Sequence, residues 1–424
     1  MTADRPRGLS GVNQTERKSA VRLVAFVCAA QVLVQIGAFF WPALLPGMIV
    51  LWSLTNSEAG WITAAFYAAY IVAVPVLVTL TDRVDAKLVY LTGVTMTIAG
   101  HLLFAVAADG FWSALAARAL AGVGWAGTYM TGLKLLADKV DSNLLSRAAA
   151  GHAASIGISG ALSFACADLL ASIGGWRLAF FAAAVSAAFA WVLIAFAIPR
   201  ETPTAPPAKA KSALFDFRPV LRNRSAMAYA IAYCIHTFEM SALRGWGVAF
   251  LAFVAMSTGA AATGLSPTMT LTLFGLIGTL ASVLGNEAAI HFGRRRLIAV
   301  AMIGSALCAV LLGTVGPHAY WLAVVLILIY GPIIWLDSSS LTAGTAGTAE
   351  PARRGATLAV HSMLGYLGGF IGPLAIGWTL DLRTGDAAAG WMTAFIGIAV
   401  LSALALIVFQ AMRPRALDGD RAGQ

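Results

Sequence analysis

"LAARALAGVGWAG", residues 115–127, places a single charge, Arg118, among apolar and small side chains. If the stretch lies in a membrane, this permanent cation must face protein or an aqueous cavity, because a charge is costly in hydrocarbon. Gly122 and Ala126 stand one and two helical turns beyond Arg118, and small residues at this spacing allow helices to pack closely. The segments around the stretch decide whether it crosses a bilayer.

The composition is that of a membrane protein. Of the 424 residues, 59% are hydrophobic and 11% are charged, whereas about a quarter of the residues of a soluble domain are charged. Apolar blocks of the roughly 20 residues that a spanning helix needs recur along the chain. The sequence therefore predicts an all-α polytopic protein. Twelve spans are expected, at 22–51, 58–80, 87–107, 111–136, 148–172, 176–198, 225–254, 265–290, 297–315, 319–342, 357–381 and 390–411.

One polar stretch divides the chain. "PRETPTAPPAKAKSALFDFRPVLRNR", residues 199–224, is rich in proline and basic residues and separates two sets of six spans. The first apolar block runs from Arg22 to about Trp52 and is too long for the apolar core of a signal peptide, so we interpret it as an uncleaved span. The expected parts are an N-terminal tail (1–21), a six-helix bundle (22–198), a linker (199–224), a second six-helix bundle (225–411) and a C-terminal tail (412–424).

Basic residues indicate the orientation of the spans. If the N-terminus is cytoplasmic, the outside loops contain only Arg177 and Arg383, and the other basic residues of loops and tails lie inside. The positive-inside rule therefore predicts that both termini are cytoplasmic, in a cell membrane that we expect to be a bacterial inner membrane. The same asymmetry accounts for the net charge of +9 without a nucleic-acid partner.

An internal repeat relates the two sets of six spans. "GGWRLAFF" (174–181) precedes span six and "AGWMTAFI" (389–396) precedes span twelve, while "GISG" (157–160) in span five corresponds to "GYLG" (365–368) in span eleven. Such a repeat predicts two halves of parallel topology around a cavity at the midplane. The small residues expected at helix contacts are Gly122, Gly124, Gly157, Gly160, Gly365 and Gly368.

Three motifs carry a resemblance to the major facilitator superfamily that covers essentially the whole chain. "VTLTDRVDAK" (78–87) is similar to the family's G-x-L-x-D-R-x-G-R-K loop but lacks both glycines. Arg118, Gly122 and Gly124 match its span-four pattern R-x-x-x-G-x-G. The corresponding loop of the second half retains only "GRRR" (293–296) of the family's loop motif. The resemblance implies twelve transmembrane helices in two six-helix bundles around a central cavity, and secondary transport by alternating access.

The resemblance also implies roles for particular charges. It assigns Arg118 to proton transfer or to the organisation of the outer half of the cavity; the alternative is an arginine that extends to the outer headgroups and does nothing more. It assigns the loop charges to a cytoplasmic gate, with Asp138 as a partner for Arg83; the alternative is a solvated charged loop. The gate residues expected are Asp82, Arg83, Lys87, Asp138, Arg294 and Arg295. Members of the family usually work as monomers, and we expect a monomer.

Span seven contains the densest group of intramembrane charges. In "YCIHTFEMSALRGWG" (233–247), His236 and Glu239 are three residues apart and share a helix face, and Arg244 lies two turns beyond His236. Such a set can bind and release a proton as its surroundings alternate. The alternative is a structural ion pair that joins helices.

Polar residues of spans one and ten complete the candidate cavity. Gln31 and Gln35 stand one turn apart in span one and can either bind a solute or tie helices together. Tyr330 and Asp337 are seven residues apart on one face of span ten, and for Asp337, nearer the inner end, a water-exposed or hinge-pairing role is weighed against a proton role. Neither a nucleotide-binding loop of the type G-x-x-x-x-G-K-[ST] nor a metal cluster stands out. We therefore expect a protein that is not an enzyme and has no cofactor and no metal site.

The leading hypothesis is a proton-coupled secondary transporter of a small solute. Span five, "GHAASIGISGALS" (151–163), lacks the Gly-Pro pair typical of drug/proton antiporters, and span one lacks the acid that many exporters use. Both departures favour uptake. Arg118, Arg244 and His236, facing one cavity, would suit an anionic solute, so the favoured activity is uptake of an organic anion by proton symport. One alternative is an antiporter that exports drugs or metabolites. The other is a sensor or membrane assembly partner that transports nothing.

Overall fold

The fold is helical throughout the part of the chain that the structure describes. The computed structural model describes residues 9–81, 83–140, 142–200, 217–260, 264–417 and 420. These residues form α-helices and two short 3-10 helices, with no strand among them. Ten segments are long and apolar enough to cross a membrane.

The first half of the chain contains six helices, and the break in span one falls between the first two of them. They are α1 (Leu9–Gln35), α2 (Phe40–Trp52), α3 (Asn56–Leu80), α4 (Ala86–Ala107), α5 (Phe111–Lys139) and α6 (Ser142–Ala197).

The second half begins with a short helix that lies inside the expected linker. Span ten, in the same half, consists of two helices. Its elements are α7 (Arg218–Arg222), α8 (Arg224–Ser257), α9 (Pro267–Phe292), α10 (Arg294–Thr314), η1 (Gly316–His318), α11 (Tyr320–Trp335), α12 (Ser338–Thr348), η2 (Pro351–Arg353), α13 (Arg354–Asp381) and α14 (Ala387–Met412).

Spans five and six form one continuous element, α6, that reverses direction at two glycines. Gly174 (φ −147°, ψ 23°) and Gly175 (φ 76°, ψ 176°) leave helical geometry. A positive φ costs glycine little, whereas residues with a Cβ adopt it only with strain. When α6 is divided at this turn and α5, which carries four charged residues, is counted as well, the chain has twelve spans in the order expected.

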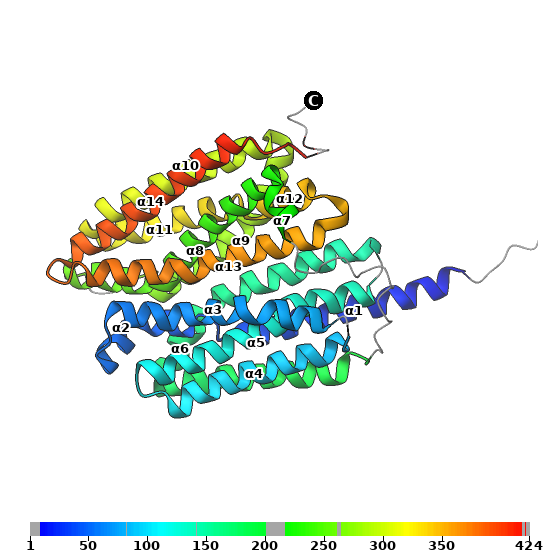
Figure 1. Ribbon diagram of the computed structural model, residues 1–424. Helices are drawn as coiled ribbons and strands as arrows, with labels where there is room; N and C mark the ends of the chain where they lie inside the picture. The colour runs from blue at the N-terminus through cyan, green and yellow to red at the C-terminus, as the bar shows by residue number, and fades with distance from the viewer. Residues whose placement is uncertain are drawn as a thin grey trace, which may run out of the picture.

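The helices are arranged as two bundles that meet along a junction. Figure 1 shows α1–α6 gathered in one bundle and α8–α14 in the other, with α3 and α13 side by side between them. The pairs α3–α13, α6–α9 and α2–α8 pack across the junction. We call the end of the molecule where α1 begins and α14 ends the chain-end face, and the other end the opposite face.

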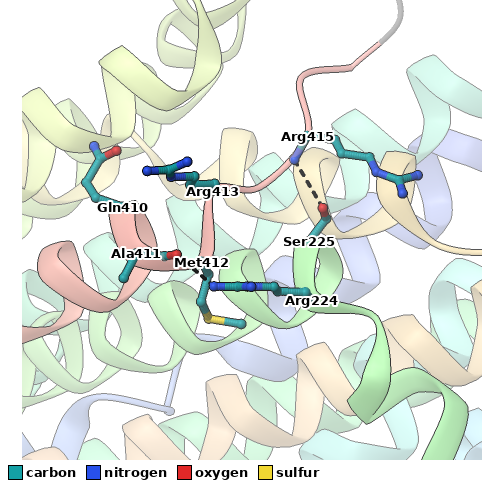
Figure 2. A pocket seen from close by; sticks show the side chains of 7 residues that line it. All are labelled: Arg224, Ser225, Gln410, Ala411, Met412, Arg413 and Arg415. Carbon is teal, nitrogen blue, oxygen red and sulfur yellow. Dashed lines mark hydrogen bonds between the residues drawn. The ribbon is translucent and has the colours of Figure 1, made fainter.

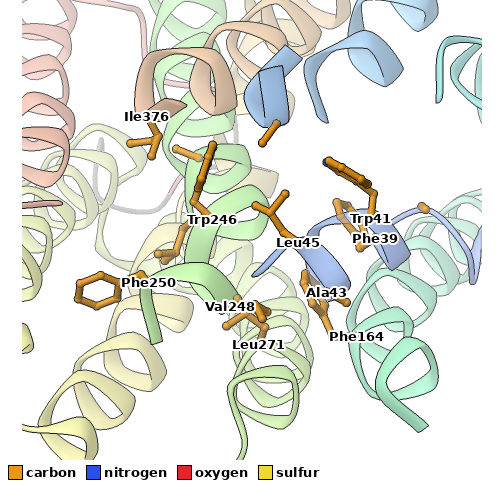
Figure 3. Packing of buried hydrophobic residues seen from close by; sticks show 14 of the residues in the cluster. Phe39, Trp41, Ala43, Leu45, Phe164, Trp246, Val248, Phe250, Leu271 and Ile376 are labelled. Atoms are coloured by element: carbon orange, nitrogen blue, oxygen red, sulfur yellow. The ribbon is translucent and has the colours of Figure 1, made fainter. Parts of the chain in front are cut away.

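Apolar side chains fill the junction toward the opposite face. In Figure 3, Leu45 of α2 lies beside Trp246 of α8, with Ile376 of α13 nearby. Leu45 is fully buried and Trp246 is 2% exposed. Each ring nitrogen of the two tryptophans here has a partner, because Trp41 donates to Thr63 Oγ1 (3.0 Å) and Trp246 donates to the Pro373 carbonyl (2.9 Å). The two halves therefore close on each other at this end.

A carboxylate joins the two halves at the same end. Asp381, the last residue of α13, accepts hydrogen bonds from Asn56 N (3.0 Å), Asn56 Nδ2 (2.9 Å) and Ser57 N (2.7 Å). Asn56 N and Ser57 N are the first backbone donors of α3, and the Thr55 hydroxyl accepts from the next, Glu58 N (3.1 Å). A helix leaves its first four N–H groups without intrahelical acceptors, and its N-terminus favours negative charge. Asp381 thus caps a helix of the other half; we call this contact the Asp381 clasp.

Candidate functional site

Arg118 lies inside the N-terminal half, on α5, with 3% of its side chain exposed. Its Nη1 donates to the carbonyl oxygen of Ala38 (3.0 Å), and its guanidinium lies 4.5 Å from the centre of the Phe66 ring. In a continuous helix the Ala38 carbonyl would accept from residue 42, which is proline and has no N–H. The break between α1 and α2 therefore leaves a buried acceptor, and the side chain of Arg118 satisfies it. The arginine points into protein, not toward headgroups.

Arg244 of α8 lies where the two halves meet. Its guanidinium is 4.9 Å from the centre of the Phe39 ring and 4.6 Å from the centre of the Trp335 ring. Phe39 belongs to the break between α1 and α2, and Trp335 ends α11, so one ring comes from each half. Arg244 is 9% exposed. Tyr67 of α3 is close enough to interact electrostatically with both Arg118 and Arg244.

These two cations have no acidic partner within the described ranges. No carboxylate oxygen described in the structure lies within 4.0 Å of the guanidinium of Arg118 or Arg244. The Nε of Arg118 also has no hydrogen-bond partner there. Aromatic faces offset part of the cost of burying a guanidinium, but the positive charge itself is not neutralised. An anion is the group that this arrangement lacks.

A small hollow lies beside Arg118, among α1, α3, α4 and α5. Gln35 lines it, and the Gln35 Nε2 is buried without a hydrogen-bond partner among the described residues. Gln31 donates to Gln35 Oε1 (2.8 Å) and accepts from the Tyr90 hydroxyl of α4 (3.3 Å). Gln31 thus ties helices together, and Gln35 keeps a free donor. The other lining residues are Val34, Ala38, Phe66, Thr97, His101, Ala121, Trp125 and Thr128.

Two acidic residues within the spans of the C-terminal half, Asp337 and Glu239, each lie in a buried pair. His236 Nδ1 of α8 lies 3.0 Å from Asp337 Oδ1, at the break between α11 and α12. Glu239 accepts a short hydrogen bond from the Tyr330 hydroxyl of α11 and a longer one from Ser402 Oγ of α14 (3.5 Å). His236, Glu239 and Asp337 are each at most 4% exposed, and Tyr330 is fully buried.

These pairings differ from the set expected in span seven. His236 pairs with Asp337, Glu239 pairs with Tyr330, and Arg244 is held between aromatic rings of the two halves. The reason is that span ten brings its own polar residues against α8, so His236 and Glu239 find partners across the helix contact. Asp337, for which water exposure was one expectation, is 3% exposed and occupies the hinge of span ten.

A histidine that the sequence analysis did not single out extends the first pair. His361 of α13 contacts Thr345 Oγ1 through Nδ1 (3.0 Å) and Thr342 Oγ1 through Nε2 (3.2 Å). The Tyr233 ring stacks on it with centroids 4.0 Å apart and lies 5.6 Å from the His236 ring. The signal for it was a polar ring near the start of an apolar span.

Aromatic side chains of both halves meet between α3, α5 and α13, a feature that was also missed. Tyr70 of α3 stacks on Tyr366 of α13 with centroids 3.6 Å apart. Trp125 of α5 lies 5.4 Å from each of these rings, and Tyr67 lies 6.2 Å from Trp125. No sequence signal marks such a group, because each ring is ordinary within its own helix.

The residues expected at the gate in the first half, where the structure describes them, do not bridge the two bundles. Asp82 lies outside the described residues. Arg83 is exposed, and Asp138 accepts from Lys134 (2.7 and 2.8 Å), one turn away on α5, and not from Arg83. The buried Lys87 donates to the carbonyls of Ala195 (2.7 Å) and Ile198 (2.5 Å), where α6 ends. Lys87 therefore satisfies carbonyls at a helix end within its own half.

The residues expected at the gate in the second half bind the C-terminal tail and α14. Arg294 donates to Asp420 through Nη2 (3.1 Å) and Nε (3.3 Å). It also donates to Asn286 Oδ1 (3.2 Å). Arg295 donates to Gln410 Oε1 of α14 (3.1 Å). These contacts too stay within one bundle.

The six glycines expected at helix contacts all lie where helices approach closely. A Cβ on Gly122 would meet the Phe66 carbonyl oxygen of α3, and one on Gly368 would meet the Cys234 carbonyl oxygen of α8. Gly157 faces Thr279 across the junction between the halves. Gly124, Gly160 and Gly365 face Thr97, Phe39 and Tyr233.

Comparison with known proteins now decides the family. A model of the Major Facilitator Superfamily matches residues 27–269, more than half of the chain. The chain belongs to the Major Facilitator Superfamily. As a member of this superfamily it is a multi-pass membrane transporter and not an enzyme. No curated protein matches its sequence.

Solved superfamily structures share the fold at low identity. A bacterial homologue of the human lysosomal transporter Spinster, in an inward-facing and unoccupied conformation, has a TM-score of 0.77 at 13% identity, over 93% of this chain and 97% of its own. The D323A variant of the nucleoside transporter NupG has a TM-score of 0.72 at 15% identity, over 92% of this chain and 100% of its own. The human organic anion transporter MFSD10 (TETRAN) has a TM-score of 0.65 at 18% identity, over 92% of this chain and 99% of its own.

Proposed function

We propose that this superfamily transporter takes up a small organic anion together with protons. The observation that carries the proposal is the pair of buried guanidinium groups, Arg118 from one half and Arg244 from the other, without an acidic partner in the described ranges. A carboxylate of a bound solute would supply the missing charge, and charge-assisted hydrogen bonds to guanidinium are strong.

Access to this site alternates between the two faces in the proposed cycle. The junction is packed around Leu45 and Trp246 and held by the Asp381 clasp at the opposite face. In this conformation a solute would therefore enter or leave at the chain-end face. The positive-inside distribution supports a cytoplasmic chain-end face in a bacterial inner membrane, with two bundles joined by the basic linker and acting as a monomer.

Protons would be carried by the two buried acidic pairs of the C-terminal half. His236 with Asp337 and Glu239 with Tyr330 lie on α8 and span ten. Arg244 lies on the same helix, α8, one turn and a residue beyond Glu239, so solute and proton would be bound by one helix. Movement of span ten relative to α8 would open both pairs and change their protonation.

Transport assays in proteoliposomes test the proposal. Full-length protein is reconstituted with pyranine trapped inside, and aliphatic and aromatic organic anions are added outside, with lipophilic cations for comparison. Acidification of the lumen on addition of an anion is expected, because proton and solute move together. Arg118→Gln and Arg244→Gln are expected to abolish the signal, whereas Arg177→Gln, which alters an exposed arginine at the opposite face, leaves it intact.

Two results would contradict the proposal. Alkalinisation of the lumen when a lipophilic cation is added outside would show exchange of the cation for protons, and would make the protein an antiporter that exports such compounds. Anion-driven acidification that persists in both Arg118→Gln and Arg244→Gln would show that the two cations do not bind the solute.

A further inference from the structure

Arginines gather around the end of α14 at the chain-end face. A hollow of about 650 Å³ is lined by Arg224, Arg413 and Arg415, together with Ser225, Gln410, Ala411 and Met412 (Figure 2). A second hollow, of about 420 Å³, includes Arg294, Arg295 and Arg296 at the start of α10 and shares Gln410 with the first. Gln410 therefore lies at the boundary of two basic hollows.

Most of these arginines have no acidic partner in the described part of the chain. Asp420 pairs with Arg294, and no other carboxylate described in the structure lies within 4.0 Å of an arginine of the two hollows. Arg224 donates to the Ala411 carbonyl (2.9 Å) and Arg295 donates to Gln410 Oε1 (3.1 Å), both neutral acceptors. The Arg295 Nε is buried and has no hydrogen-bond partner among the residues that the structure describes.

The side chains converge on one place. In Figure 2, Arg224 and Arg413 extend toward the side of Gln410 and Ala411, whereas Arg415 points away. Helix α10 begins at Arg294, near Gln410, and its N-cap residue, Gly293, provides no side-chain cap. Its first N–H groups, like every helix N-terminus, favour an anion. Arg224, Arg295 and Arg413 around Gln410 form what we call the Gln410 basic site.

Lipid-facing side chains continue from the site toward the membrane interior. On α14, Leu404 (51% exposed) and Ile407 (63%) stand on the same helix face as Ala411, which lines the first hollow. On α10, Val300 (63%) and Ile303 (49%) continue the face of Arg296. A ligand with an anionic head and acyl chains matches this order of charge and apolar surface.

We propose that the Gln410 basic site binds the phosphate headgroup of an anionic phospholipid whose acyl chains lie along α10 and α14. Basic pockets between spanning helices at the leaflet boundary are suited to such headgroups. The lipid would join the end of α14 to the starts of α8 and α10, the helix ends that the C-terminal tail also contacts. The site is separate from the buried arginines of the transport site, so it does not depend on the proposed substrate.

Binding of fluorescent phosphatidylglycerol to full-length protein in neutral micelles tests the site. The double variant Arg224→Gln/Arg413→Gln is expected to bind about thirtyfold more weakly, since an arginine near a headgroup contributes about 1 kcal/mol. Arg413→Gln alone, whose side chain makes no described hydrogen bond that the fold would lose, is expected to bind about fivefold more weakly. The control Arg353→Gln/Arg354→Gln removes the same charge from the same face and is expected to bind like the parent protein.

Three outcomes would overturn the lipid assignment. Equal binding of phosphatidylcholine would show that the negative charge is not recognised. Equal weakening in the Arg353→Gln/Arg354→Gln control would show that only the overall positive charge of the face matters. Displacement of the lipid by inorganic phosphate at the lipid's own concentration would make a soluble phosphate the ligand.

Discussion

Pro42 explains how an arginine can be held inside the N-terminal bundle without a carboxylate. By lacking an N–H, the proline leaves the Ala38 carbonyl free, and Arg118 donates to it. A neutral carbonyl fixes the position of the guanidinium but does not neutralise it. The positive charge therefore remains for a ligand, which a structural ion pair would not allow.

Arg244 is expected to lower the stability of the free protein. Replacing a buried charge by an apolar side chain of similar length is often stabilising, so Arg244→Met should raise the free energy of unfolding by about 1–2 kcal/mol while it abolishes anion-driven acidification. Denaturant unfolding in micelles measures the first effect and the pyranine assay the second. Arg118→Met is the comparison, because it leaves the Ala38 carbonyl without a donor and should gain less stability. A loss of stability in Arg244→Met would contradict the expectation.

Glu239 is expected to couple transport to protons. Glu239→Gln keeps an oxygen that accepts from Tyr330 but cannot release a proton, so uptake driven by a pH gradient should fall at least about tenfold. Exchange of labelled for unlabelled anion at equal pH should persist, since it needs no net proton movement. Asp337→Asn, assayed in parallel, shows whether the second pair contributes. Gradient-driven uptake that is unchanged in Glu239→Gln would remove this carboxyl from the mechanism.

The C-terminal tail is bound to the second bundle by hydrogen bonds and an ion pair. Tyr229 donates to the Arg415 carbonyl (3.0 Å), the Arg415 N–H donates to Ser225 Oγ (3.1 Å), and Asp420 pairs with Arg294. The second-half loop carries Ile290 where the superfamily motif has an acid. Asp420 of the C-terminal tail supplies a carboxylate to that loop from 126 residues further along the chain.

Removal of this carboxylate should destabilise the second bundle. Asp420→Asn leaves Arg294 buried at 4% exposure without its counter-charge, and loss of one partner of a buried pair costs about 3 kcal/mol. Thermal unfolding and proteolysis of the tail measure the effect. Asp138→Asn is the matched control, because its pair with Lys134 is exposed and worth less than about 1 kcal/mol. Similar small effects in both variants would show that the tail contact contributes little.

For the whole molecule, the Asp381 clasp is expected to bias the transporter toward closure at the opposite face. Hydrogen bonds to a charged group are worth about 1.5–3 kcal/mol, so Asp381→Ala should increase the population open at that face by about tenfold or more. The labelling rate of a cysteine introduced by Leu45→Cys, in a background without the four native cysteines, reports this opening. Asp386→Ala is the control, since Asp386 accepts from Ala389 N and so caps α14 of its own half. Equal labelling in both variants would exclude a role for the clasp.

The twelve spans could be predicted from sequence because the signals are local: apolar length, polar punctuation and the Gly174–Gly175 turn. The partners of the buried charges could not be predicted from the sequence. His236 and Asp337 are 101 residues apart, and their pairing depends on the rotation and depth of two helices, which a hydropathy pattern does not fix. The capping of α6 by Lys87 and the contact between Arg294 and Asp420 were hidden for the same reason.

The two-residue turn inside α6 has a consequence for synthesis at the ribosome. Because only Gly174 and Gly175 separate spans five and six, no hydrophilic loop has to be threaded across the bilayer between them. The single charge near the turn is Arg177. Even at the centre of a spanning helix an arginine costs only about 3 kcal/mol, which two apolar spans together outweigh. Residues 142–197 are therefore expected to leave the translocon as one helical hairpin, and a nascent chain arrested after span five should still be held there.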